Sequence, residues 1–188
     1  LQVDLPKGFQ NKVILTPWYV RQYDANDTIK DAPIQKQLSL LSAEEKKSLQ
    51  QAEQHNNTPG TKIFDAMGRP FMAIQYLKPI DQLSSDTDIL VTHTTLNIEG
   101  KGLNNTDPRL YQQNKSNGRK DHNFVYRYAM SGFLLHVWSA DAGEQYAFAD
   151  ALGRTQITKD SRGFVRTSSY DLLGRAVKVH VKGKEGLQ

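Results

Sequence analysis

The sequence predicts a mainly β fold made of antiparallel hairpin repeats. Three copies of Asp-x-x-Gly-Arg support this, at 65–69, 150–154 and 171–175, each flanked by strand-forming residues. Aspartate at the first position of a turn can accept backbone N–H groups, and glycine at the fourth can adopt the positive φ that closes a tight hairpin. Recurrence of one turn in 188 residues indicates a repeat protein.

The composition excludes several classes of protein. Hydrophobic residues make up 38% of the chain and charged residues 23%. This balance suits sheets with one buried face and one solvent-exposed face. The net charge of +4 comes with both signs spread along the chain, so we predict no nucleic-acid partner. The absence of cysteine excludes disulfides and thiolate metal sites. No apolar run approaches the roughly 20 residues that span a bilayer, so we expect no membrane span.

Residues 1–60 are predicted to form a strand segment followed by a helical insertion. Apolar and polar residues alternate over 18–23, which is typical of a strand. Ser-Ala-Glu-Glu at 42–45 is a capping box and predicts a helix from about 42 to 54. The chain starts with neither methionine nor a signal peptide, so we expect it to be a fragment of a larger chain.

Residues 61–188 are predicted to form the repeat sheet. Five turn glycines align, and they are separated by 32, 32, 21 and 21 residues: Gly68, Gly100, Gly132, Gly153 and Gly174. About five units of ~21 residues explain this spacing if polar loops are inserted near 78–88 and 104–122. A second set of turns at 141–143, 160–163 and 182–183 makes the hairpins consecutive.

The last predicted strand, 176–182, indicates how the faces differ. Val177, Val179 and Val181 point one way, and the lysines and histidine between them point the other. We therefore expect one buried face and one wet face. On a buried face, aromatic residues belong to a core more readily than to a carbohydrate-binding strip. The residues concerned are Tyr126, Tyr128, Trp138, Tyr146, Phe148 and Tyr170.

The turn motif resembles that of a known family of repeat proteins. Tyr-Asp-Leu-Leu-Gly-Arg at 170–175 and Phe-Ala-Asp-Ala-Leu-Gly-Arg at 148–154 place their glycines 21 residues apart, and they resemble the RHS, or YD, repeat. Further pieces resemble the B component of bacterial insecticidal Tc toxin complexes. They include Thr-Pro-Trp-Tyr-Val-Arg at 16–21, His-Asn-Asn-Thr-Pro-Gly at 55–60 and Asp-Ser-Arg-Gly-Phe-Val-Arg-Thr at 160–167.

The resemblance implies a curved, spiralling sheet that is part of a hollow shell. In that family the B and C components enclose a C-terminal toxic effector, which the A-component channel later receives. The implied partners are the remainder of the B-component chain, the C component, the enclosed effector and, through regions outside this segment, the A component. The implied location is a secreted, extracellular toxin complex. The family's self-cleavage signature, Asp-Pro-x-Gly, is absent: Asp107-Pro108 lacks the glycine and is interpreted as a turn.

No motif predicts an enzyme. The five histidines are scattered, and neither His-Glu-x-x-His nor Gly-x-Ser-x-Gly occurs. We therefore predict no catalytic residue, no cofactor and no metal. Asp65, Asp150 and Asp171 are interpreted as turn-closing residues because each lies three residues before a glycine. Their arginines are expected to form a stacked ladder with neighbouring aspartates.

The predicted site is therefore architectural. Its residues are Asp65, Gly68, Arg69, Gly100, Gly132, Asp150, Gly153, Arg154, Tyr170, Asp171, Gly174 and Arg175. Two functions remain open on this basis. The first is a structural wall segment of an RHS-repeat shell that encapsulates a toxic effector. The second is an RHS-repeat segment of a cell-surface, carbohydrate-binding or adhesion protein.

Overall fold

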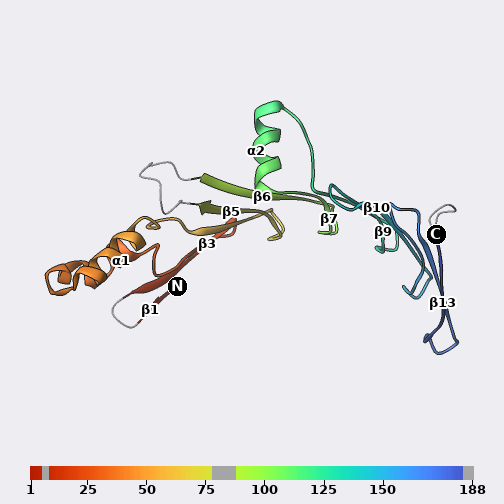
Figure 1. Cartoon of the computed structure of the whole chain (residues 1–188), viewed down its shortest axis with the longest axis horizontal. Coiled ribbons are helices and arrows are strands. Elements are labelled where there is room, and N and C mark those ends of the chain that lie inside the picture. The colour runs from red at the N-terminus through yellow and green to blue at the C-terminus, as the bar shows by residue number, and fades with distance from the viewer. Residues whose placement is uncertain (6–8, 78–87, 184–188) are drawn as a thin grey trace. The chain divides into compact units, whose positions relative to one another are not determined.

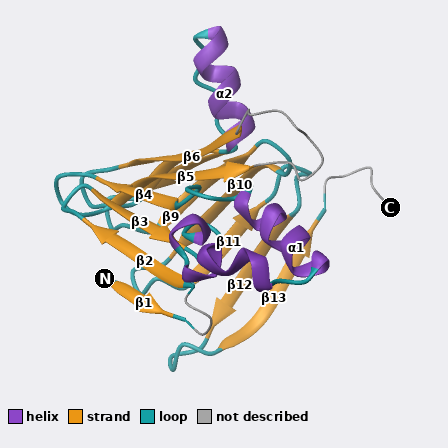
Figure 2. Cartoon of the chain, turned by 90° about the vertical axis from the view of Figure 1, so that its left-hand side faces the viewer, coloured by secondary structure: helices purple, strands orange, loops and turns teal. Residues whose placement is uncertain are grey.

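A computed structural model describes residues 1–5, 9–77 and 88–183 of the chain. In these residues thirteen strands form one antiparallel sheet, and each strand pairs with its neighbours in sequence order (Figures 1 and 2). The strands β1 and β13 have a single partner each, so the sheet is not closed. The predicted mainly β, antiparallel hairpin fold is confirmed.

The chain packs as two compact units, Leu1–His93 and Thr94–Gln188, and β6 runs across the boundary. The predicted division into 1–60 and 61–188 stays a prediction. The first unit contains β1 (Gln2–Asp4), β2 (Gln10–Leu15), β3 (Tyr19–Tyr23), η2 (Ile29–Asp31), η3 (Pro33–Leu40), α1 (Ala43–Glu53), β4 (Gly60–Phe64), β5 (Pro70–Leu77) and most of β6 (Asp88–Leu96). The second contains β7 (Gly102–Thr106), α2 (Pro108–Asn117), β8 (Phe124–Tyr128), β9 (Leu134–Ser139), β10 (Gly143–Ala149), β11 (Thr155–Lys159), β12 (Val165–Tyr170) and β13 (Ala176–Lys182).

The predicted helical insertion is present between β3 and β4. The Ser42 hydroxyl accepts the Glu45 N–H at 3.2 Å, and the Glu45 carboxylate accepts the Ser42 N–H at 2.9 Å. This reciprocal capping satisfies two N–H groups that the first turn of α1 leaves without helical partners. The helix begins where the capping box predicts.

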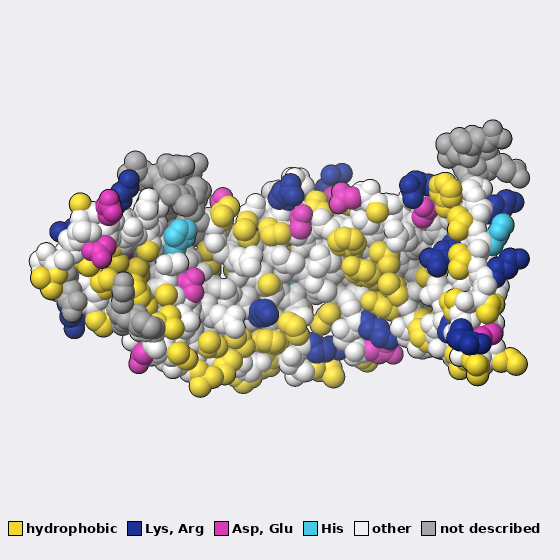
Figure 3. Space-filling model, turned by 60° about the horizontal axis from the view of Figure 1, so that its bottom comes forward, with side chains coloured by type: hydrophobic (Ala, Val, Ile, Leu, Met, Phe, Trp, Pro, Cys, Tyr) yellow, Lys and Arg dark blue, Asp and Glu magenta, His cyan; other side chains and the backbone are white. Residues whose placement is uncertain are grey.

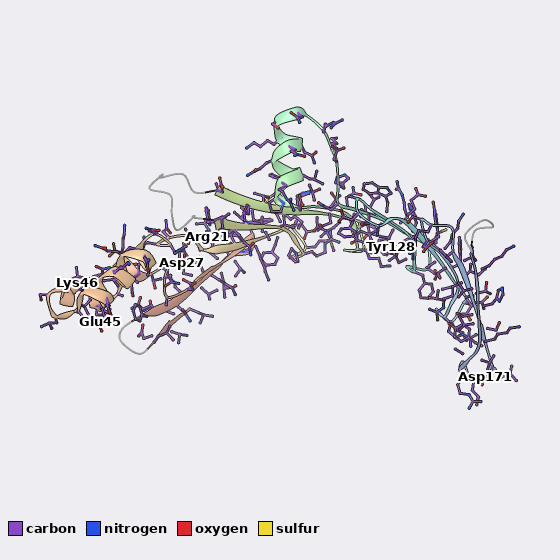
Figure 4. The ribbon with its side chains drawn as sticks, in the orientation of Figure 1. Arg21, Asp27, Glu45, Lys46, Tyr128 and Asp171 are labelled. Carbon is purple, nitrogen blue, oxygen red and sulfur yellow. The ribbon has the colours of Figure 1, made fainter. Side chains whose placement is uncertain are left out.

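A buried aspartate ties the two ends of the insertion together (Figure 4). Asp27 is 9% exposed. One of its carboxylate oxygens accepts the Thr58 N–H and the Thr58 hydroxyl, both at 2.8 Å, and the other accepts the Asp24 N–H at 2.9 Å. The Asn57 N–H donates to the Asp27 carbonyl at 3.0 Å. The insertion therefore leaves and rejoins the sheet at one hydrogen-bonded point.

The prediction of one buried sheet face is wrong for the described residues. Their buried hydrophobic side chains are Ile29, Ala32 and Leu49, all within the helical insertion. Val177 and Val181 are 63% and 56% exposed, and every residue of β13 is exposed. Hydrophobic side chains accordingly reach the surface over much of the face in Figure 3.

The second predicted loop contains a helix that the sequence analysis missed. The Asp107 carboxylate caps α2 by accepting the Leu110 N–H at 2.8 Å, Pro108 occupies the first turn, and Gly118 ends the helix at φ +66°. Asp-Pro therefore starts a helix here, as it can wherever the missing proline N–H would have no partner. The helix stands out from the end of β7 (Figure 1). The first predicted loop lies outside the described residues except for Asp88, which begins β6.

In the described part of the chain, no helix combines the length and the apolar character that crossing a membrane requires.

Replacing Asp27 by alanine should loosen the insertion. The change removes the acceptor of the Asp24 and Thr58 N–H groups. Asp24 is exposed and Thr58 is half-buried, so the loss should be about 1 kcal/mol per hydrogen bond. Hydrogen exchange over 55–58 should become roughly tenfold to hundredfold faster. Asp31→Ala is the matched control, since the exposed Asp31 carboxylate takes no part in this cluster. Equal exchange in the two variants would contradict the role given to Asp27.

Candidate functional site

The repeated turns share one hydrogen-bonding pattern, seen clearly between β10 and β11. The Gly153 N–H donates to the Asp150 carbonyl at 2.9 Å, and the Asp150 N–H donates to the Arg154 carbonyl at 3.0 Å. One Asp150 carboxylate oxygen accepts the N–H groups of Leu152 and Arg154 at 3.0 and 2.9 Å. The aspartate therefore closes the loop with its side chain as well as its backbone.

Among the described residues the same backbone pattern occurs in six turns. The fourth residue is a glycine with φ between +74° and +88° in each: Gly68, Gly100, Gly132, Gly153, Gly163 and Gly174. Side chains with a Cβ rarely adopt this left-handed region. The Gly163 turn belongs to the same type, although the sequence analysis assigned it to the second set of turns. Phe164 takes the place of arginine there, which hides the likeness.

The predicted site residues lie in these turns. The β4–β5 turn holds Asp65, Gly68 and Arg69; the β6–β7 and β8–β9 turns hold Gly100 and Gly132; the β10–β11 turn holds Asp150, Gly153 and Arg154; the β12–β13 turn holds Asp171, Gly174 and Arg175, with Tyr170 ending β12. Figure 4 shows Asp171 at the free end of the last hairpin.

Each arginine pairs with the aspartate of its own turn. The distances from the arginine Nε to the second carboxylate oxygen are 2.7 Å for Arg69–Asp65, Arg154–Asp150 and Arg175–Asp171. The pKa of Asp171 is lowered first by its hydrogen bonds from Arg175 and least by the charge of Arg154 in the preceding turn. The expected interaction with a neighbouring aspartate is therefore present at Arg154, but it is weaker than the pair within each turn. Partly exposed pairs of this kind add little stability, so their effect is to orient the side chains.

The pairing perturbs the aspartates. The hydrogen bond from the Arg154 side chain, followed by that from the Arg154 backbone N–H, lowers the pKa of Asp150 from the ordinary 3.8. The same two bonds from Arg69, in the same order, lower the pKa of Asp65. These carboxylates accept several donors and stay ionised at neutral pH, so they are poorly suited to serve as general acids.

A tyrosine joins the last turn to the preceding repeat. The Tyr170 hydroxyl donates to the Thr155 carbonyl at 2.8 Å, and the Arg154 guanidinium lies 5.1 Å from the centre of the Tyr170 ring. This places the tyrosine of the Tyr-Asp motif against the arginine of the previous turn. The contact combines a hydrogen bond with a cation–π interaction.

The same contact occurs two repeats earlier, at the Gly132 turn, with different residues. The Tyr128 hydroxyl donates to the Gly102 carbonyl at 3.0 Å, and the Lys101 ammonium lies 5.5 Å from the ring centre. The sequence analysis missed this pair because lysine replaces arginine and Ala129 replaces the motif's aspartate. The spacing from the turn glycine could have identified it, since Lys101 and Arg154 both directly follow one.

The turn glycines also make room for a side chain from the preceding turn. A Cβ on Gly153 would come within 2.8 Å of the Phe133 ring, and one on Gly174 would lie 3.4 Å from Arg154. A Cβ on Gly132 would collide with the Lys101 side chain. Lys101, Phe133 and Arg154 each follow a turn glycine directly. The residue after one glycine therefore fills the space left by the next.

The aromatic residues do not form one core. Tyr126 pairs with Val137, whereas Trp138 is the next residue on β9, so Tyr126 and Trp138 point to opposite faces of the sheet. Phe148 is 51% exposed. The prediction of a shared aromatic core is therefore wrong, because both faces of the described sheet carry aromatic side chains.

In the ranges that the structure describes, no three His, Cys, Asp or Glu side chains gather as a metal site would require. His136 stacks on Tyr146 with ring centres 4.5 Å apart, which is a packing contact between strands. The expectation of no catalytic residue, cofactor or metal stays a prediction.

Substituting the glycine of the last turn tests the turn geometry. Gly174 has φ +80°, so Gly174→Val should destabilise the β12–β13 hairpin by about 1–3 kcal/mol. Gly174→Asn should cost less, because asparagine tolerates this region better. Gly60→Val is the control, since Gly60 has no positive φ and no heavy atom within 4 Å of an added Cβ. Equal urea stability of all three variants would refute the assignment.

The Asp150–Arg154 pair should make turn stability depend on pH. Because the folded pKa is lowered, ionised Asp150 stabilises the turn above the unfolded value near 3.8, and this contribution is lost as pH falls through the folded pKa. Arg154→Gln should raise the Asp150 pKa toward the ordinary value. A carboxyl NMR titration measures it, and an unchanged pKa in the variant would argue against the pair.

Comparison with known proteins supports the resemblance that the turns indicate. No family model matches the chain. Toxin subunit YenC1 of Yersinia entomophaga is 26% identical over 117 residues, which is 62% of this chain and 12% of that protein. The TcdB2-TccC3-TEV crystal structure matches all of the chain with a TM-score of 0.81 and 24% identity, a likeness of fold. The Tc holotoxin pore of Photorhabdus luminescens also matches all of it, with a TM-score of 0.79 and 25% identity.

The chain covers 8% of each of these two solved chains, so it corresponds to a small part of each. The sheet of consecutive hairpins, the repeated turns and the matches all agree. In sequence and in fold, the chain is therefore similar to an RHS-repeat segment of the B and C components of Tc toxins.

Proposed function

We propose that the chain is a structural wall segment of an RHS-repeat shell that encapsulates a C-terminal toxic effector in a Tc-type toxin complex. The observation that carries this proposal is the open antiparallel sheet, whose full described length follows the fold of TcdB2-TccC3. A role in a toxin complex is supported by the relatives. Enclosure of an effector is the step that the proposal adds.

The open ends of the sheet support a wall segment. The strands β1 and β13 each have one described neighbour, which leaves a row of backbone donors and acceptors on the outer side of each. Such edges invite pairing with further strands. In the proposed shell, preceding and following repeats of a B-component chain pair with these two strands.

The exposed faces also suit a wall. A self-contained domain would bury one face, but β13 is exposed along its whole length. A single sheet with two open faces has one face available for the enclosed polypeptide and one for solvent. The proposed partners are the rest of the B component, the C component and the effector, with the A-component channel contacting other regions. The proposed location is the secreted, extracellular complex.

The chemistry of the turns agrees with a non-enzymatic role. Their carboxylates are engaged by backbone N–H groups and by arginine, so they act on the chain itself. The alternative of a carbohydrate-binding or adhesion segment gains no specific support, because Tyr126 and Trp138 lie on opposite faces and form no single strip.

Protease protection tests the proposal. The full-length B component, assembled with its C component, should shield the effector from an added protease until the complex is unfolded. A matched control is the effector produced alone, which should be degraded. Digestion of the effector at equal rates in the complex and alone would contradict encapsulation.

A further inference from the structure

A pair of basic residues lies in the loop that follows α2. Arg119 and Lys120 come directly after Gly118, which ends the helix, and every residue from 117 to 121 is exposed. The side chain of Arg119 is 70% exposed. We call α2 and the loop 118–123 the arm. The helix of the arm stands out from the sheet in both views of the ribbon (Figures 1 and 2). The basic pair is therefore accessible in the described chain.

The backbone at this pair is less constrained than the backbone beside it. In the described residues, neither Arg119 nor Lys120 makes a backbone hydrogen bond. Asp121 is fixed, because its N–H donates to the Asn114 side chain at 3.0 Å and its carbonyl accepts from that side chain at 2.7 Å. The ion pair from Arg119 to Asp121 spans 3.8 Å between exposed side chains and adds little order. The Arg119–Lys120 bond thus lies in an unpaired stretch.

The helix of the arm can open at low cost. It has ten residues and no buried side chain, and isolated helices shorter than roughly 12–15 residues are marginal in water. Segments of this kind open locally with little free energy, and a protease cuts the opened form. The helix α1 differs, because its buried Leu49 anchors it within the insertion. The basic pair Lys46–Lys47 of α1 is therefore expected to resist cleavage.

The other basic residues lie in regular structure. In the ranges that the structure describes, every further lysine or arginine belongs to a helix, a strand or one of the repeat turns. The backbone groups of a strand are paired in the ladder, so a protease that needs an extended substrate must first break those hydrogen bonds. Arg119 and Lys120 differ from all of these residues in lying in an irregular, exposed loop.

We propose that the Arg119–Lys120 bond is a cleavage site for an extracellular protease of the trypsin type, whose specificity pocket takes a basic side chain. Water is the second reactant. It adds across the peptide bond, which leaves a carboxylate on Arg119 and a new amino group on Lys120. The inference rests on the proposed function for its setting, because a secreted complex meets such proteases.

The two pieces of the cut chain stay joined through contacts between the strands on either side of the arm. β7 pairs with β8 in the sheet, and the Asn123 N–H donates to the Asn105 carbonyl at 2.8 Å. The Thr106 hydroxyl lies 2.9 Å from His122 Nδ1, and the Asp107 N–H donates to the Asn123 side chain at 2.6 Å. One cut in the arm therefore leaves the sheet whole.

Limited digestion of the full-length B component, assembled with its C component, tests the proposal. Trypsin is added in native buffer, and mass spectrometry identifies the new chain ends. Within this segment the first cut should fall after Arg119. Arg119→Gln combined with Lys120→Gln should slow cleavage of the loop at least tenfold. The matched control combines Lys46→Gln with Lys47→Gln, which removes the basic pair of α1 and should leave the first cut unchanged.

Gel filtration tests whether the cut wall stays joined. The two pieces of the B component should elute together in native buffer and separate in denaturant. Pieces that separate in native buffer would contradict the contacts assigned to β7 and β8.

The remaining outcomes separate this inference from the proposed function. A first cut elsewhere in the segment would overturn the site, as would loop cleavage at the wild-type rate in the variant without Arg119 and Lys120. Digestion of the effector inside that uncut variant would refute encapsulation and leave the cleavage site standing. An intact loop in the unmodified protein, together with a protected effector, would refute the cleavage site alone.

Discussion

The left-handed backbone of the turn glycine is the constraint on which the sheet depends. Glycine adopts this conformation without steric cost, and the residue three positions earlier then closes the loop by hydrogen bonding. The missing Cβ has a second effect, because it leaves space for Phe133 beside Gly153 and for Arg154 beside Gly174. One small residue therefore fixes the hairpin and admits the side chain that links it to the preceding hairpin.

Local signals made part of this fold predictable from sequence. The Asp-x-x-Gly turns and the capping box at Ser42 act through residues three or four positions apart, so a single sequence reveals them. The helix α2 escaped detection because Asp107 and Pro108 occur in turns as well as at helix N-termini, and its polar body has no buried residue. Burial could not be predicted, because it depends on what covers the sheet.

The candidate site, like the fold, could be predicted only in part. Tyr170 and Arg154 were identified through the motif, whereas Tyr128 and Lys101 make the same contact without it. What recurs is geometry: a cation or an aromatic ring follows one glycine and packs against the next. Such a contact tolerates changes of residue type. A wall built in this way distributes its stability over many small contacts between neighbouring repeats.

Electron cryo-microscopy of the full-length protein tests the central claim most directly, because it shows what lies against the two open edges of the sheet. The account predicts that β1 and β13 each pair with a further strand, and that the described sheet forms part of one continuous wall around a cavity. A map in which these thirteen strands fold face to face into a sealed sandwich with its own core would contradict it.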